Sequence, residues 1–178
     1  MKIVLAAFMI LCLAASATAV FVWSGFYDVA ADVPHWRITE LVLEEARERS
    51  IYEHSKGIIV PPLKDPTLIK IGFSHYHAMC RFCHNAPGYS RTEISRGLYP
   101  APPDFTAKGM SFPSDKEVYW IVANGIKMTG MPSFRATHTE EELWGMILFA
   151  KRVPGMRPEE YEVMLKEAGP YEGEIHHN

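Results

Sequence analysis

The sequence predicts an all-α protein in which an N-terminal membrane helix precedes a small helical domain. Residues 3–27 form a run of 25 residues without a charged side chain, and about 20 mostly apolar residues suffice to span a membrane. Further along the chain, apolar residues recur at helical spacing, and no segment shows the alternation of a half-buried strand.

The composition of the 178-residue chain excludes several classes of protein. Its formal net charge of −3 argues against a nucleic-acid binder, and 48% hydrophobic residues argue against a disordered chain. Three cysteines are an odd number, which disfavours a disulfide scaffold. The positions of the cysteines are therefore the most informative feature.

The first 28 residues are expected to form an uncleaved transmembrane anchor that contacts lipid through residues 3–27. Lys2 precedes the apolar run and Asp28 and Asp32 follow it, which places the N-terminus in the cytoplasm and the rest of the chain outside. A cleaved signal peptide is the alternative, because Ala17-Thr18-Ala19 resembles a cleavage site. Either interpretation exports the remaining chain.

Residues 29–66 are expected to form a connector. From Trp36 to His54, apolar residues have helical spacing, and the prolines that follow end the helix. This helix could hold the next domain away from the membrane, or it could pack along that domain.

Residues 67–155 are expected to form a domain of helices and two long loops. We expect a helix over 67–80 capped by Thr67, and capping boxes at Ser114 and Thr139 open helices that run to Asn124 and to about Lys151. The loops, 85–113 and 125–138, are long for so small a domain and suggest that the chain wraps a large apolar group. Residues 156–178 are expected to form a short helix and an acidic tail.

The motif Cys80-Arg81-Phe82-Cys83-His84 is C-x-x-C-H, the attachment signature of a c-type haem. Thiols three residues apart on a helical turn can reach both vinyl groups of one haem, and the adjacent His84 can bind the iron. A redox dithiol or half of a zinc site would be the alternative, but no strand pattern or further cysteine outside the membrane segment supports either. We therefore expect one covalently bound haem c, held by Cys80, Cys83 and His84.

A second axial ligand is expected from the loop over 125–138. Met131 is favoured, with Met128 as the runner-up, because a thioether sulfur suits an electron-transfer haem. A histidine would be the alternative ligand, from His75, His77 or His138.

The chain over about residues 67–155 resembles the class I monohaem cytochromes c. The resemblance rests on Cys80–His84, on Gly72 and Tyr76, and on Thr129-Gly130-Met131-Pro132. The wider chain, including residues 27–36, resembles the small membrane-anchored bacterial members.

The resemblance implies a cytochrome c-like helical fold wrapped around one covalent haem. It implies that Gly72 and Tyr76 meet Trp144 or Phe149 where the first and last helices cross. It also implies that the carbonyl of Pro103 orients the His84 imidazole, with Pro103 lying in the second shell of the iron.

These expectations lead to a membrane-tethered electron carrier rather than an enzyme. It would pass single electrons between respiratory or dehydrogenase proteins on the outer, periplasmic face of a bacterial inner membrane, and residues 67–155, with a net charge of +3, suit an acidic partner surface. The donor and acceptor are not indicated. A fixed haem subunit of a larger membrane oxidoreductase complex is the alternative function, and a ligand-binding haem enzyme or gas sensor is a third.

Overall fold

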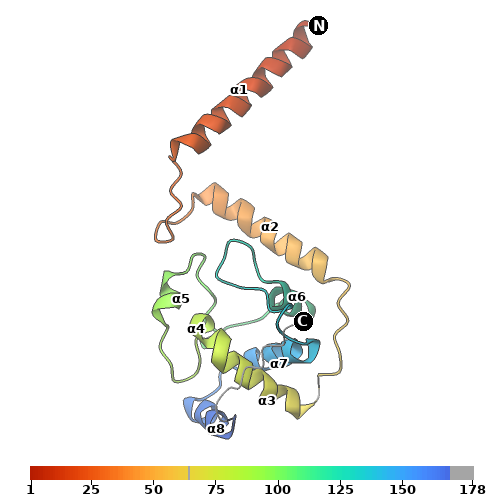
Figure 1. The fold of residues 1–178 in the computed structure, drawn as a ribbon, viewed down its shortest axis with the longest axis vertical. Coiled ribbons are helices and arrows are strands. Elements are labelled where there is room, and N and C mark those ends of the chain that lie inside the picture. The colour runs from red at the N-terminus through yellow and green to blue at the C-terminus, as the bar shows by residue number, and fades with distance from the viewer. Residues whose placement is uncertain (64, 169–178) are drawn as a thin grey trace. The chain divides into compact units, whose positions relative to one another are not determined.

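A computed structural model describes residues 1–63 and 65–168, and these residues form helices and loops without a β-strand (Figure 1). The chain divides into two compact units, Met1–Pro34 and a second unit that begins at His35. The α-helices are α1 (Lys2–Ser24), α2 (Arg37–Ser55), α3 (Pro66–His75), α4 (Arg81–His84), α5 (Glu93–Gly97), α6 (Asp115–Asn124), α7 (Glu140–Ala150) and α8 (Pro158–Ala168), and a π-helix, η1 (Tyr76–Cys80), joins α3 to α4. The expected acidic tail lies outside the described residues.

Helix α1 is the one helix among the described residues that is long and apolar enough to cross a membrane. Its 23 residues have a mean hydropathy of 2.5 over the most apolar window, and no part of that window is buried in the protein. At 1.5 Å per residue it is about 34 Å long, which matches a hydrocarbon core of about 30 Å. The helix ends at Ser24 and is capped by Gly25, whose left-handed φ of 66° suits glycine.

Helix α2 packs against the following domain, which is the second of the two roles considered for the connector. Its buried residues, Ile51 and Ser55, lie in its last two turns. In the same part of the helix, the His54 ring lies 5.7 Å from the ring of Trp120 on α6. The connector helix and the domain therefore belong to one compact unit.

The helix expected over 67–80 begins one residue earlier and continues through η1 and α4. The expectation that Thr67 caps this helix is wrong. The Asp65 side chain accepts a hydrogen bond from the Thr67 N–H at 2.8 Å, because Pro66 occupies the first helical position and leaves Asp65 as the N-cap.

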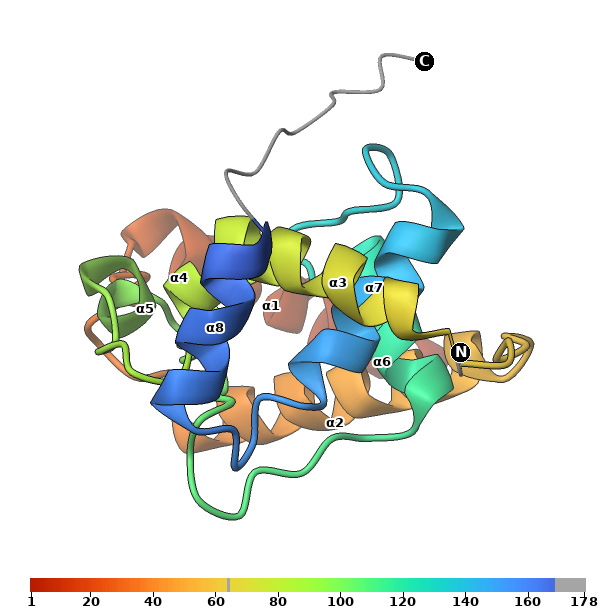
Figure 2. The same cartoon turned by 90° about the horizontal axis from the view of Figure 1, so that it is seen from below.

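The core forms where α3 crosses α7, and glycine makes this crossing possible. A Cβ at Gly72 would lie 1.9 Å from the carbonyl oxygen of Gly145, and one at Gly145 would lie 2.8 Å from the carbonyl oxygen of Leu68. The backbones of α3 and α7 are therefore in direct contact at these two glycines. Figure 2 shows α3 lying against α7.

Aromatic rings pack beside the glycine crossing. The rings of Tyr76 and Phe149 lie 5.2 Å apart, so Phe149 is the aromatic partner that the resemblance implied for this helix pair. Trp144 has a different role, because it stacks on Tyr119 of α6 at 4.4 Å. Gly145, which the sequence did not single out, supplies the close approach.

Helix α8 extends the same core with an aromatic residue from outside the expected domain. Tyr161 is fully buried, and its ring lies 5.1 Å from that of Phe73 on α3. Its hydroxyl lies 3.0 Å from Nδ1 of His77. The C-terminal helix is thus part of the packed unit, beside α3 (Figure 2).

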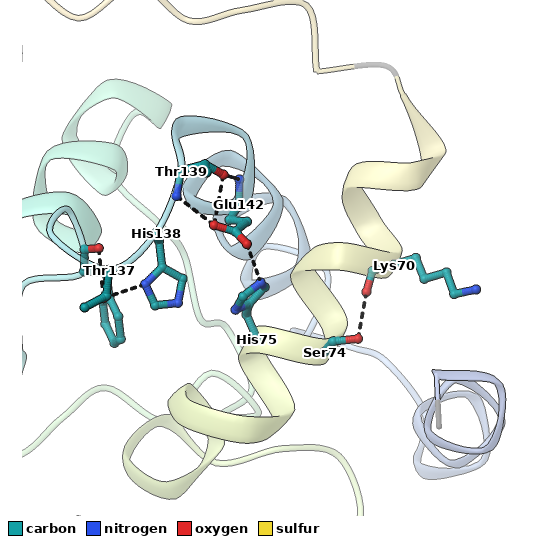
Figure 3. Close-up of polar contacts among 8 residues, drawn as sticks. Lys70, Ser74, His75, Thr137, His138, Thr139 and Glu142 are labelled. Atoms are coloured by element: carbon teal, nitrogen blue, oxygen red, sulfur yellow. Dashed lines mark hydrogen bonds and ion pairs between the residues drawn. The ribbon is translucent and has the colours of Figure 1, made fainter. Parts of the chain in front are cut away.

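A second tie between α3 and α7 is polar (Figure 3). His75 is 9% exposed, and its Nε2 lies 3.5 Å from Oε1 of Glu142. Glu142 also closes the capping box of α7, where it accepts a hydrogen bond from the Thr139 N–H at 2.7 Å. The His138 ring lies 4.9 Å from His75. This cluster joins α3, the start of α7 and the end of the preceding loop.

The pKa values of His75 and Glu142 both lie below the ordinary values of these side chains. Burial lowers the pKa of His75, and the neighbouring His138 lowers it further, although Glu142 acts in the opposite direction. Partial burial raises the pKa of Glu142, but hydrogen bonds from Thr139 outweigh it, and the pKa lies below the usual value. The folded protein therefore favours neutral His75 beside an ionised carboxylate.

Replacing Gly72 with alanine is expected to destabilise the second unit by about 3 kcal/mol or more, since backbone cannot move aside as a flexible side chain can. Guanidinium unfolding of the detergent-solubilised protein, followed by circular dichroism, measures this loss. Gly57→Ala is the matched control, because a Cβ there meets no atom within 4 Å. Equal unfolding midpoints for Gly72→Ala and Gly57→Ala would show that the crossing is looser than described.

Stability is expected to fall as the pH drops below about 6.5, the ordinary pKa of histidine. Because the pKa of His75 is lower in the folded state, the unfolded chain binds a proton first. The contribution of His75 is complete above the unfolded pKa and is lost as the pH falls toward the folded one. Unfolding free energies measured from pH 8 to pH 5 should decline less steeply for His75→Gln than for the unaltered chain. Parallel declines would refute the assignment to His75.

Candidate haem site

The two thiols of the C-x-x-C-H motif lie at successive helical segments. Cys80 ends η1 and Cys83 lies within α4, three residues further on. Residues at this spacing are neighbours on a helical surface. Cys80 packs against the aromatic cluster around Phe73 and also against the cluster around Trp144. The Cys80 sulfur therefore lies between the two packed clusters of the domain.

The electrostatic surroundings of the thiols do not suit a redox dithiol. Burial and the neighbouring Cys83 raise the pKa of Cys80 to about 12, and burial raises the pKa of Cys83 as well. A reactive dithiol needs a lowered pKa, because the thiolate is the nucleophile. Within residues 1–63 and 65–168, no group of three or more His, Cys, Asp and Glu side chains is placed to hold a metal ion.

His84 follows the second thiol, and its ring is held in a defined orientation. Its Nδ1 lies 2.9 Å from the carbonyl oxygen of Pro103. A carbonyl oxygen only accepts, so Nδ1 carries the proton and Nε2 keeps an available lone pair. Burial lowers the pKa of His84, against smaller raising effects of Pro103 and Asp104, and favours the neutral imidazole that binds a metal.

The loop that carries Pro103 is fastened to the segment after His84. Asn85 has a positive φ of 66°, which asparagine tolerates better than most residues, and its side chain reaches this loop. Its Nδ2 donates to Oδ2 of Asp104 at 3.1 Å and to Oγ1 of Thr106 at 3.2 Å. The Phe105 ring stacks on the His84 ring at 4.3 Å. These contacts hold the imidazole between fixed neighbours.

Asn85 and Phe105 were not identified from the sequence. An asparagine directly after a helix is a signal for a left-handed turn, and it could have indicated the role of Asn85. The stacking of Phe105 had no local signal, because Phe105 lies 21 residues after His84 and depends on the loop that returns to it.

Helix α5 lies in the stretch that was expected to be an irregular loop, 85–113. It satisfies carbonyl groups at the end of α4, since Ser95 Oγ donates to the Cys83 oxygen at 2.8 Å and Thr92 Oγ1 donates to the Phe82 oxygen. The last carbonyls of a helix lack partners within it, and α5 supplies them here. The short helix therefore stabilises the segment that presents Cys83 and His84.

The loop over 125–138 folds back on itself and places Met131 and Met128 differently. The Ile126 N–H donates to the Met131 oxygen at 3.1 Å, and the Met131 N–H donates to Thr129 Oγ1 at 3.1 Å. The backbone of Met131 is thus tied down and its side chain is partly buried. Met128 lies at the loop tip, where it is 98% exposed.

Two glycines allow this loop to close. Gly125 has a φ of 68°, and a Cβ there would lie 2.7 Å from backbone atoms of Pro132 and Ser133. A Cβ at Gly130 would lie 2.6 Å from the Leu98 side chain, which belongs to the loop after α5. The methionine loop is therefore packed closely against itself and against the loop after α5.

The alternative histidine ligands have partners elsewhere in the packed unit. His75 and His138 lie in the polar cluster with Glu142. His77 lies against Tyr161 of α8, and its ring stacks at 5.9 Å on Phe73. The residues that fit a covalent haem are thus two thiols on one helical turn, an imidazole with its Nε2 available, and an anchored loop that offers a thioether sulfur.

Comparison with known protein families supports a cytochrome c domain in part of the chain. A family model described as subunit III of cbb3-type cytochrome c oxidase matches residues 67–149. No curated protein and no solved structure matches the chain. The matched segment begins one residue into α3 and ends one residue before the end of α7, so it contains the helix crossing, the C-x-x-C-H motif and both loops. The match supports a class I-like cytochrome c domain over residues 67–149.

Proposed function

We propose that this protein is a membrane-tethered electron carrier with a single covalent haem, on the outer face of a bacterial inner membrane. The observation that carries the proposal is the His84 imidazole, whose Nδ1–H donates to the Pro103 carbonyl directly after the two attachment cysteines. Electron transfer follows from the cytochrome c family itself. The single-haem stoichiometry follows from the single C-x-x-C-H motif in the chain.

In this proposal Cys80 and Cys83 form thioether bonds to the haem, and His84 and Met131 bind the iron. A haem bound in this way supplies a one-electron ferrous–ferric couple. Residues of the chain around His84 hold this iron ligand in place. Pro103 fixes the imidazole proton on Nδ1, and Phe105 packs on the ring. No substrate bond is made or broken, so the protein is a carrier rather than an enzyme.

Helix α1 would anchor the carrier with the haem domain on the periplasmic side. Lys2 is the first residue of the helix, before its apolar run, and the acidic Asp28 and Asp32 follow the helix, as expected for a cytoplasmic N-terminus. The tether keeps the carrier close to membrane-bound redox partners. The mildly basic haem domain favours donors and acceptors with acidic surfaces, and steering of this kind raises the rate of encounter more than the affinity.

Met131→Ala is expected to remove the weak charge-transfer band between a methionine sulfur and ferric iron. It should also lower the reduction potential by a substantial fraction of the about 0.8 V range that axial ligands span. Optical spectra during a redox titration measure both effects. Met128→Ala is the matched control and should change neither, because Met128 is exposed at the loop tip. Loss of the band in Met128→Ala alone would identify Met128 as the ligand, and a high-spin spectrum in the unaltered protein would indicate a ligand-binding haem protein.

A second candidate is a fixed haem subunit of a larger membrane oxidoreductase. The matched family is described as an oxidase subunit, and α2 and α8 both lie outside the matched segment, where they could form an interface. Native mass measurement after mild solubilisation from the source membrane distinguishes the two functions. A single chain is expected for the carrier. A stable complex that survives high salt would favour the subunit.

A further inference from the structure

Helix α2 has two halves that differ in their surroundings. Its last two turns pack on the domain through Ile51, Ser55 and His54. In its first half, Ile38 is 66% exposed, and Leu41 and Val42 are 46% and 59% exposed. These three residues, here called the proximal apolar face, lie at the end of α2 that is nearer to α1 along the chain.

The spacing of the three residues places them together on one side of the helix. Positions i, i+3 and i+4 are neighbours on a helical surface. Further along the same side of α2, Glu45 and Arg49 form an ion pair at 2.7 Å, and next comes Tyr52, whose ring is covered by the Lys56 ammonium at 4.6 Å. This side of α2 is thus apolar at one end only and polar along the rest, which indicates a localised contact.

The chain itself indicates what covers the proximal apolar face. Helix α1 ends at Ser24 and α2 begins at Arg37, so only residues 25–36 separate them. A flexible chain of this length has a root-mean-square reach of about 20 Å. If α1 crosses the membrane, the first turns of α2 stay within that distance of the lipid surface. The proximal apolar face then always lies near the bilayer, which acts as an apolar phase at a high effective concentration.

The residues around the face fit a lipid interface of low charge. Trp36, which is 49% exposed, directly precedes α2, and tryptophan favours the boundary between headgroups and acyl chains. The first half of α2 carries one arginine against three glutamates, namely Arg37, Glu40, Glu44 and Glu45. This excess of negative charge disfavours attraction to anionic headgroups. Contact would therefore depend on apolar burial.

We propose that the proximal apolar face of α2 docks into the membrane interface and holds the haem domain in a fixed orientation on the bilayer. This inference rests on the membrane anchor proposed above for α1. Ile38, Leu41 and Val42 enter the boundary region, while the packed half of α2 transmits their position to α6. The anchor alone would leave the domain free to rotate about residues 25–34, whereas a docked α2 fixes which side of the domain faces partners.

The test uses nitroxide labels on the full-length holoprotein in phosphatidylcholine liposomes. With Cys80 and Cys83 bound to haem, the native Cys12 is the one remaining thiol and reports on α1. In a Cys12→Ala background, Val42→Cys reports on the proximal apolar face, and Glu53→Cys on the other half of α2 is the matched control. Accessibility to oxygen, which partitions into lipid, is compared with accessibility to a water-soluble nickel chelate.

The expected result is loss of chelate accessibility with high oxygen accessibility at position 42, while the label at position 53 remains open to chelate. This pattern should persist at high salt and without anionic lipid. Adding Ile38→Asp and Leu41→Asp should return the label at position 42 to the accessibility of position 53. Haem absorbance confirms that these variants fold.

Other outcomes overturn the inference in distinguishable ways. A lipid-shielded Cys12 label with an open label at position 42 refutes the docking but keeps the anchor. Absence of a lipid-shielded Cys12 label refutes the anchor, and with it the tethering part of the proposed function. Exclusion of both oxygen and chelate at position 42 shows that protein, not lipid, covers the face.

Discussion

The close approach of α3 and α7 at Gly72 and Gly145 is the constraint on which the rest of the domain depends. With no side chain at either position, the two helices meet backbone to backbone. That distance allows Tyr76 to reach Phe149 on one side and His75 to reach Glu142 on the other. Because α3 continues without a break into η1 and α4, the same crossing sets where Cys80, Cys83 and His84 lie.

The site is assembled by loops that are fastened to this helical frame. Pro103 reaches His84 because Asn85 holds Asp104 and Thr106, and α5 is positioned by hydrogen bonds to carbonyls of α4. Gly125 lets the methionine loop close against its own backbone. Few of these ties are long side-chain ion pairs. A site built from short backbone-anchored contacts loses little geometry to side-chain motion, which suits a group that must exchange electrons without rearranging.

Features with a local cause could be predicted from the sequence. The capping boxes at Ser114 and Thr139 need only four adjacent residues, and both begin helices as expected. The C-x-x-C-H motif predicted a cytochrome c domain, which the matched family confirms. Two contacts between distant residues, Tyr76 with Phe149 and Pro103 with His84, were implied only by the family resemblance. Other features that depend on distant residues were missed. Helix α5 has five residues and is held by α4, and Gly145 has meaning only opposite Gly72.

The packing of α2 and α8 shows that the compact unit is larger than the segment that matches the family. Similarity to the family covers residues 67–149, yet Tyr161 of α8 covers Phe73, and His54 of α2 covers Trp120. A fragment cut at the limits of similarity would expose both of these inner surfaces to water. The segment that matches the family and the compact unit therefore have different boundaries, because the compact unit begins at His35 and includes α8.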